Sequence, residues 1–187
     1  MGLEVIKSKK IRLPKDADLF RQTYEKQQSI ESVHVIKLAV FPDDYGGWFK
    51  ESIRLDENGH VLSLLEKGIE FSPVQMNMVN LAPDTHRFWH IHLEQNEIWT
   101  TNGTLLIGLI DFREGSPTYG QKTKVILSSE KALFIPSGVA HGFINPTDKY
   151  VTLNYFTDKY FVGDENTQEC RIDPQDIPFD FVKPELM

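Results

Sequence analysis

The feature that most constrains the fold is a succession of short β-type segments that begins at Val33. Runs rich in Val, Ile, Leu, Phe and Thr alternate with turn residues, and no amphipathic helix of ordinary length separates them. Among these runs are "HVLSLLEKG", "VQMNMVNL", "RFWHIHL", "EIWTTNGTLLIGLIDF" and "YVTLNYFT". This pattern predicts an all-β sandwich or barrel around a small cavity.

The first 32 residues have a different composition from the rest of the chain. The stretch "KDADLFRQTYEKQQSIES" is rich in helix-forming residues, and Asp16 or Asp18 is a suitable N-cap. We therefore expect an N-terminal helical extension at 1–32 with one short helix, followed by one β-barrel domain at 33–187. The last residues are rich in Pro and Asp, which predicts an irregular tail on the surface of that domain.

The charge and composition argue against several kinds of partner. The formal net charge is −7, whereas binding to nucleic acid or to an anionic membrane surface depends on a positive field. No run approaches the roughly 20 apolar residues that a membrane span needs, and the N-terminus lacks the apolar core of a signal peptide. Together with a single cysteine, Cys170, these features predict a cytoplasmic protein. They leave open a small anionic ligand held by a few arginines in a cleft.

The segment "WHIHLEQNEIW" carries the first candidate chemistry. Alternate side chains of a strand share a face, so His90 and His92 point the same way. A tight connection after them would let Glu97 face the same cavity from the next strand. Because imidazoles and carboxylates are ligands of divalent transition metals, the segment predicts a metal site.

A fourth ligand is offered by "PSGVAHGFIN", in which His141 follows a turn of Pro and Gly at the start of a strand. The spacing H-x-H-x4-E, followed by P-x-G-x2-H-x3-N, resembles the paired motifs of the cupin superfamily. The resemblance implies a jelly-roll β-barrel that binds one divalent metal through His90, His92, Glu97 and His141. The donor atoms do not choose among Zn, Fe, Mn and Ni.

A second resemblance covers the chain from about Val35 to Phe181. The segments "VFPDDYGGWFKES", "VQMNMV", "RFWH", "DFREGSPTYG", "LFIPSGVAHGF" and "RIDPQDIPFDF" follow the order seen in dTDP-4-dehydrorhamnose 3,5-epimerases, which are cupins that work without a metal. Similarity to this family implies a homodimer, a nucleotide-sugar substrate and His90 as the catalytic base. It also implies contacts with the nucleotide and its diphosphate from Glu51, Gln75, Asn77 and Arg87.

The chain departs from this family at two catalytic positions. The family's lysine, which stabilises an enolate, is matched by Asn96, and its acid tyrosine by Asn154, with Tyr155 one residue later. Asn154 is then expected beside the substrate, and Tyr155 on the opposite face unless a bulge intervenes. A metal could replace the lysine, because a divalent cation also polarises a carbonyl. The stretch "HIHLEQNEIW" is also similar to the metal-bearing cupin domain of bifunctional capsular-sugar epimerase/reductases.

The leading hypothesis is epimerisation or isomerisation of a 4-keto sugar nucleotide by proton abstraction next to the carbonyl. His90 and Tyr155 are the candidate catalytic residues, and Trp99 is a candidate stacking partner for a base or sugar ring. A histidine that ligates a metal cannot also be the free base, which leaves Tyr155 or a metal-bound hydroxide as alternative proton carriers. The same ligands would suit a metal-dependent oxygenase, and the lost lysine and tyrosine would suit a non-catalytic sugar-nucleotide binding module.

Overall fold

The computed structural model describes residues 5–6, 10–15, 17, 19–20, 28–161, 169–177 and 179, and the chain divides into two compact units. One unit comprises residues 1–27 and 182–187, and the other comprises residues 28–181. In the first unit the described residues include two short strands, β1 (Val5–Ile6) and β2 (Leu19–Phe20), which pair antiparallel. The helix predicted for 1–32 falls mostly outside the described residues, and those that are described there form no helix.

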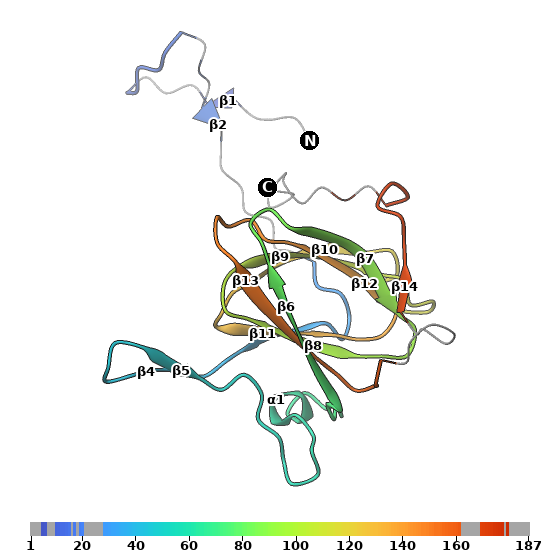
Figure 1. Cartoon of the computed structure of the whole chain (residues 1–187). Coiled ribbons are helices and arrows are strands. Elements are labelled where there is room, and N and C mark those ends of the chain that lie inside the picture. Colours follow the sequence, from blue (N-terminus) through green and yellow to red (C-terminus); the bar gives the residue numbers. More distant parts are fainter. Residues whose placement is uncertain are drawn as a thin grey trace. The chain divides into compact units, whose positions relative to one another are not determined.

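The larger unit is built from two five-stranded antiparallel sheets (Figure 1). One has the order β10-β9-β12-β7-β14, with bounds Lys122–Leu127, Leu105–Asp111, Val139–Ile144, His86–His92 and Glu169–Arg171. The other has the order β3-β11-β8-β13-β6, with bounds His34–Lys37, Lys131–Ile135, Glu97–Thr101, Val151–Thr157 and Gln75–Leu81. The all-β architecture predicted from the strand pattern is confirmed.

The main core lies between the two sheets. Leu109 and Leu133, one from each sheet, are fully buried in a single apolar cluster with Leu153. Smaller clusters cover the outer faces: Trp89 and Ile91 pack under the segment that follows β14. Because Trp89 and Ile91 point outward, the alternate residues of β7 point into the barrel, where they can line a cavity.

One segment predicted as a strand is a helix instead. "HVLSLLEKG" contains α1 (Leu62–Leu65), and Leu64 is completely buried against Phe71 in a cluster on the outer face of the second sheet. Consecutive leucines favour a helical turn over an extended strand, because leucine has a high helix propensity and no branch at Cβ. The strand prediction for this segment was wrong.

A hairpin formed by β4 (Val40–Pro42) and β5 (Trp48–Lys50) projects from the barrel (Figure 1). Phe41 and Phe49 stack on each other across the hairpin with their ring centroids 6.2 Å apart, yet they remain 51% and 60% exposed. Lys50 ties the hairpin to the barrel through a hydrogen bond of 2.9 Å from its Nζ to the carbonyl oxygen of Thr101.

A β-bulge interrupts the pairing of β7 with β12. His90 lies opposite His141, but Arg87 lies opposite Phe143, so two residues of β7 face the single residue Gly142. Without the extra residue, positions 87 and 90 would point to opposite faces of the sheet. A Cβ on Gly142 would lie 2.9 Å from the carbonyl oxygen of Arg87, which explains why glycine occupies this position.

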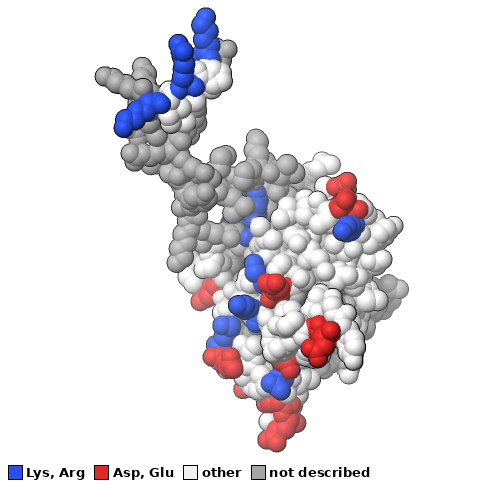
Figure 2. Space-filling model, turned by 90° about the vertical axis from the view of Figure 1, so that its left-hand side faces the viewer, with Lys and Arg blue, Asp and Glu red and all other residues white. Residues whose placement is uncertain are grey.

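Basic and acidic side chains are interspersed on the face of the barrel in Figure 2, with broad uncharged areas between them. On this face they do not form a continuous basic patch. Among the helices that the structure describes, none is long and apolar enough to cross a bilayer.

Candidate active site

A cavity of about 370 Å³ opens between the two sheets. Its lining comes from both sheets and from the loop after β13. It consists of Gln75, Asn77, Val79, Arg87, His90, His92, Gln95, Glu97, Trp99, His141, Gly142, Phe143, Leu153, Tyr155, Thr157, Tyr160, Phe161 and Arg171. Glu97 is the one acidic residue in this set.

The strand period places the two motif histidines as predicted. His90 and His92 both line the cavity, whereas Trp89 and Ile91 point to the outer face of the sheet. The same alternation on β6 turns Gln75 inward. Arg87 joins the histidines on the cavity side, at the position where the bulge in β7 has shifted the register.

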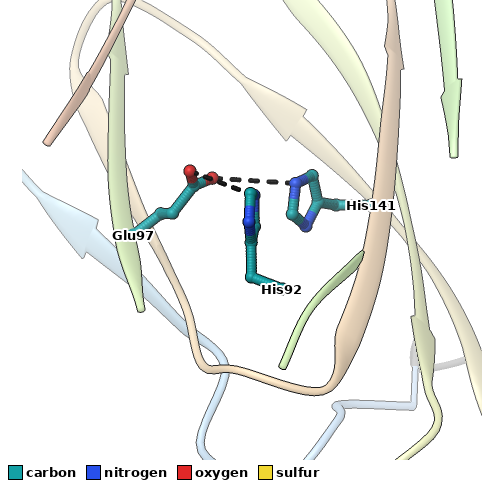
Figure 3. A group of neighbouring side chains, drawn as sticks. All are labelled: His92, Glu97 and His141. Carbon is teal, nitrogen blue, oxygen red and sulfur yellow. Dashed lines mark ion pairs between the residues drawn. The ribbon is translucent and has the colours of Figure 1, made fainter. Parts of the chain in front are cut away.

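Three of the four predicted metal ligands, all of them in the cavity lining, point toward one another (Figure 3). Glu97 extends from β8 toward His92, at the end of β7, and toward His141 on β12. Glu97 Oε1 lies 3.3 Å from His92 Nε2, and Glu97 Oε2 lies 3.7 Å from His141 Nε2. The ligand atoms of these three buried residues all lie within 4.8 Å of one another. His90 lines the same cavity but is not part of this group.

Neighbouring side chains fix the orientation of the Glu97 carboxylate. Trp99 Nε1 donates a hydrogen bond of 2.7 Å to Oε2, and Gln95 Nε2 donates one of 3.0 Å to Oε1. Burial raises the pKa of Glu97, but its contacts with the two histidines and Trp99 lower it by more, so the pKa lies below its ordinary value. The carboxylate is therefore held ionised in a closed environment.

The tautomer of His141 is fixed by the backbone. Its Nδ1 lies 3.1 Å from the carbonyl oxygen of Val139, which can only accept a hydrogen bond, so Nδ1 carries the hydrogen. Burial lowers the pKa of His141 to about 4, so the ring is neutral at pH 7 and the lone pair of Nε2 faces Glu97. A lone pair and a carboxylate repel each other unless a proton or another cation lies between them.

These residues fit a divalent transition metal. Two ligand atoms on one tetrahedral ion, each at about 2.0 to 2.1 Å, lie about 3.3 Å apart. The separations of 3.3 and 3.7 Å from Glu97 to the histidine nitrogens are close to that value. The fixed tautomer of His141 also presents the nitrogen that a metal would need.

Of the remaining predicted site residues, some line the cavity and others do not. Tyr155 lines the cavity, and β13 pairs with its neighbours without a bulge, so Asn154 points to the opposite face of that strand. Glu51 lies just after the β4–β5 hairpin, outside the cavity lining, where its carboxylate is 4.0 Å from Arg54. Trp99 packs edge-on against His141, with centroids 5.0 Å apart, and is 3% exposed.

The sequence profile of the dTDP-4-dehydrorhamnose 3,5-epimerase family matches residues 27–186. The chain belongs to this family. Spore coat polysaccharide biosynthesis protein SpsL of Bacillus subtilis (strain 168) is 32% identical over 154 residues, which is 81% of this chain and 91% of that protein. The dTDP-4-dehydrorhamnose 3,5-epimerase of Escherichia coli (strain K12) is 31% identical over 137 residues, 68% of this chain and 71% of the other.

A solved member of the family has the same architecture. The dTDP-6-deoxy-D-glucose-3,5-epimerase of Legionella pneumophila Philadelphia 1, in complex with dTDP-4-keto-L-rhamnose, superposes with a TM-score of 0.65 at 27% identity. The match covers 80% of this chain and 78% of that one. The predicted jelly-roll cupin fold is thereby confirmed.

Asn96 holds two loops together at the edge of the cavity. Its side chain donates a hydrogen bond of 2.6 Å to Asp158 Oδ2 and accepts one of 2.9 Å from the backbone N–H of Ser137. Asn96 is not among the residues that line the cavity. At the position that the family resemblance assigns to a catalytic lysine, this chain therefore has a residue that joins the β7–β8 loop to the turn before β12 and to the loop after β13.

Side chains of the segment "DFREGSPTYG" form a hydrogen-bonded network around Asp111, which we call the clasp. Asp111 is fully buried and accepts hydrogen bonds from Arg113, Ser116 and Thr118, the shortest being 2.6 Å. Arg113 in turn packs beneath Gly138, where an added Cβ would lie 2.5 Å from the Arg113 Cγ. Gly138 has a φ of +76° and donates its N–H to the carbonyl oxygen of His92 at 2.7 Å. The clasp therefore supports the strand end that carries a metal-ligand candidate.

Several cavity residues were not singled out by the motif analysis, among them Gln95, Tyr160, Phe161 and Arg171. Gln95 lies in the loop between β7 and β8, where its side chain donates a hydrogen bond to Glu97. Tyr160 and Phe161 lie in the loop after β13 and are 68% and 63% exposed at the cavity. Arg171 comes from β14, which pairs with β7. No local pattern shows that an isolated arginine near the end of the chain will lie next to His90.

Proposed function

We propose that the protein epimerises or isomerises a 4-keto sugar carried on dTDP, by removing a proton from a carbon next to the carbonyl. One observation carries this proposal: His90 and Tyr155 line a single cavity from opposite sheets. An imidazole can remove a proton on one side of a bound sugar, and a phenol can return one on the other. The substrate class comes from the names of the relatives, which are epimerases of dTDP-linked keto sugars.

His90 acts as the base in this proposal. The proposed metal group consists of His92, Glu97 and His141 and does not include His90. In this proposal His90 does not have to act as both metal ligand and base. Tyr155 serves as the acid, a role that the resemblance assigned to the neighbouring position 154.

We propose in addition that His92, Glu97 and His141 hold one divalent transition metal. The support is the burial of all three residues, the separation of their ligand atoms and the fixed tautomer of His141. A bound divalent cation would polarise the sugar carbonyl, which lowers the cost of removing the adjacent proton. Gln95 and Trp99 would keep the carboxylate turned toward the two histidines.

Another part of the cavity lining suits a nucleotide. Gln75 Nε2 donates a hydrogen bond of 2.8 Å to Asn77 Oδ1, and both amides line the cavity beside the exposed rings of Tyr160 and Phe161. Amides can read the polar edge of a base while an aromatic ring stacks on its face. Arg87 is exposed at the same cavity and suits a phosphate, which its planar guanidinium grips through two hydrogen bonds.

The family resemblance also leads us to propose a homodimer. The exposed aromatic residues of the β4–β5 hairpin support this, since such a patch is usually covered by another surface. Light scattering on a size-exclusion column tests it. A monomer that persists at high protein concentration would reject the dimer without affecting the proposed chemistry.

Solvent exchange tests the chemistry directly. The protein is incubated with dTDP-4-keto-L-rhamnose in heavy water, and deuterium at the carbons that flank the carbonyl is followed by NMR. We expect incorporation by the wild type, and its loss in His90→Gln and Tyr155→Phe. If the wild type binds dTDP but exchanges no proton, the catalytic proposal fails and a binding module remains.

Elemental analysis tests the proposed metal site independently of the proposed catalytic base. The wild type should contain about one metal ion per chain, and His92→Ala should lose most of it because one ligand of the group is gone. His90→Gln is the matched control, since it should lose exchange and retain the metal. Equal metal content in the wild type and His92→Ala would exclude the proposed ligand set.

A further inference from the structure

Arg171 is a second cationic side chain at the cavity. It lies in the edge strand β14, where its Cα pairs with that of His90 across the ladder to β7. It is exposed, and it lines the same cavity as Arg87. Strand β14 thus brings Arg171, which is far from His90 in the sequence, to within one strand spacing of this proposed catalytic base.

The two arginines are placed to act on one ligand. Arg87 is three residues from His90 along β7, a distance of about 10 Å in an extended strand. The bulge opposite Gly142 puts Arg87 on the cavity side, and Arg171 reaches that side from the neighbouring strand. Two long guanidinium side chains therefore flank His90 from two directions.

The charge of the ligand explains why two cations are useful. A nucleoside diphosphate carries more negative charge than one guanidinium neutralises, and the chain as a whole carries a net charge of −7. Among the described residues that line the cavity, Glu97 is the one acidic residue, and its carboxylate already faces His92 and His141. The arginines make the cavity locally attractive to an anion that the rest of the surface would repel.

We infer that Arg171 binds the diphosphate of the ligand together with Arg87, and so selects a nucleoside diphosphate over the nucleoside. This inference rests on the proposed function, because it assumes that a dTDP-linked sugar occupies the cavity. In this arrangement Arg171 contacts the diphosphate, and His90 remains the group that removes the proton. Arg171 is thus a residue that determines ligand specificity rather than one that transfers a proton.

Calorimetric titration with dTDP and with thymidine tests the inference. Arg171→Gln should weaken dTDP binding on the order of tenfold to a hundredfold, because charge-assisted hydrogen bonds to phosphate are lost. Thymidine binding should stay within about twofold, since thymidine carries no phosphate to lose those bonds. Lys37→Gln removes the same charge from an exposed site on β3 and should change neither affinity.

A second variant guards against a folding defect in Arg171→Gln. Arg171→Lys retains the charge but not the planar fork, and should weaken dTDP binding by a smaller factor. Unchanged dTDP affinity in both variants, or an equal loss for dTDP and thymidine, would overturn the inference. If the wild type does not bind dTDP, the proposed function and this inference fail together, whereas wild-type binding with unaffected variants rejects the inference alone.

Discussion

The buried carboxylate of Asp111 offers a quantitative test of how the site is supported. Replacing it by asparagine retains the size of the side chain but removes the charge that faces Arg113. We expect Asp111→Asn to destabilise the barrel substantially, because Asp111 is fully buried and accepts bonds from three residues. An asparagine can accept through one oxygen only, and its amide group would face other donors.

The magnitude follows from the contacts. Arg113 Nε and Nη2 each lie 2.8 Å from a different oxygen of Asp111, which makes the pair bidentate. Breaking a buried ion pair by removing one partner costs about 3 to 5 kcal/mol. Because the Arg113 side chain is 22% exposed and water can solvate it in part, we expect a loss of about 3 kcal/mol, at the lower end of that range. For a domain of this size that corresponds to a decrease in Tm of about 6 to 12 °C.

The pH dependence of the unfolding free energy provides a second, independent test of the Asp111–Arg113 ion pair. Although burial raises the pKa of Asp111, hydrogen bonds from Arg113, Ser116 and Thr118 hold it well below its ordinary value. Below a pH of about 4 the unfolded chain binds a proton at this carboxyl that the folded chain does not. The stabilisation is therefore complete above that pH and decreases as the pH falls, so the gap in unfolding free energy between wild type and variant should narrow from pH 7 to pH 3.

Urea and thermal unfolding followed by circular dichroism measure both parts. Asp148→Asn makes the same change at an exposed position and is the control. A decrease in Tm no larger than that of the control would falsify the account of the clasp. If Asp111→Asn lowers the stability strongly but by the same amount at pH 7 and pH 3, the side chain is important for packing and the ion pair with Arg113 is not the cause.

Three further changes test other parts of the site. Gly142→Ala places a Cβ 2.9 Å from the Arg87 carbonyl oxygen, so it should cost about 1 to 3 kcal/mol of stability and weaken dTDP binding by displacing Arg87; unchanged dTDP affinity would argue against the bulge as its positioning device. Trp99→Phe removes the 2.7 Å hydrogen bond to Glu97 and should lower metal content more than stability, as measured by elemental analysis beside thermal unfolding. Asn96→Ala should destabilise the protein by about 1 to 3 kcal/mol in urea unfolding, because it leaves the Ser137 N–H without its partner; full stability would show that water replaces the side chain.

The local pattern of the sequence was enough to predict the all-β fold and the placement of His90, His92 and Glu97 in one cavity. Strand period two places His90 and His92 on one face wherever the strand lies, and the tight turn after them returns Glu97 to that face. These relations depend on neighbours in the chain, which a sequence displays directly. The same reasoning misread "HVLSLLEKG", because the choice between strand and helix there depends on the pocket that Leu64 fills.

Only the tertiary structure decided how distant strands align. The bulge between β7 and β12 puts Arg87 in the cavity, and continuous pairing along β13 puts Tyr155 there in place of Asn154. Arg171 reaches the same cavity because β14 adds to the edge of β7. A shift of one residue in any of these pairings would reverse which side chains face the interior, and no local pattern records that register because it is set by packing between segments far apart in the chain.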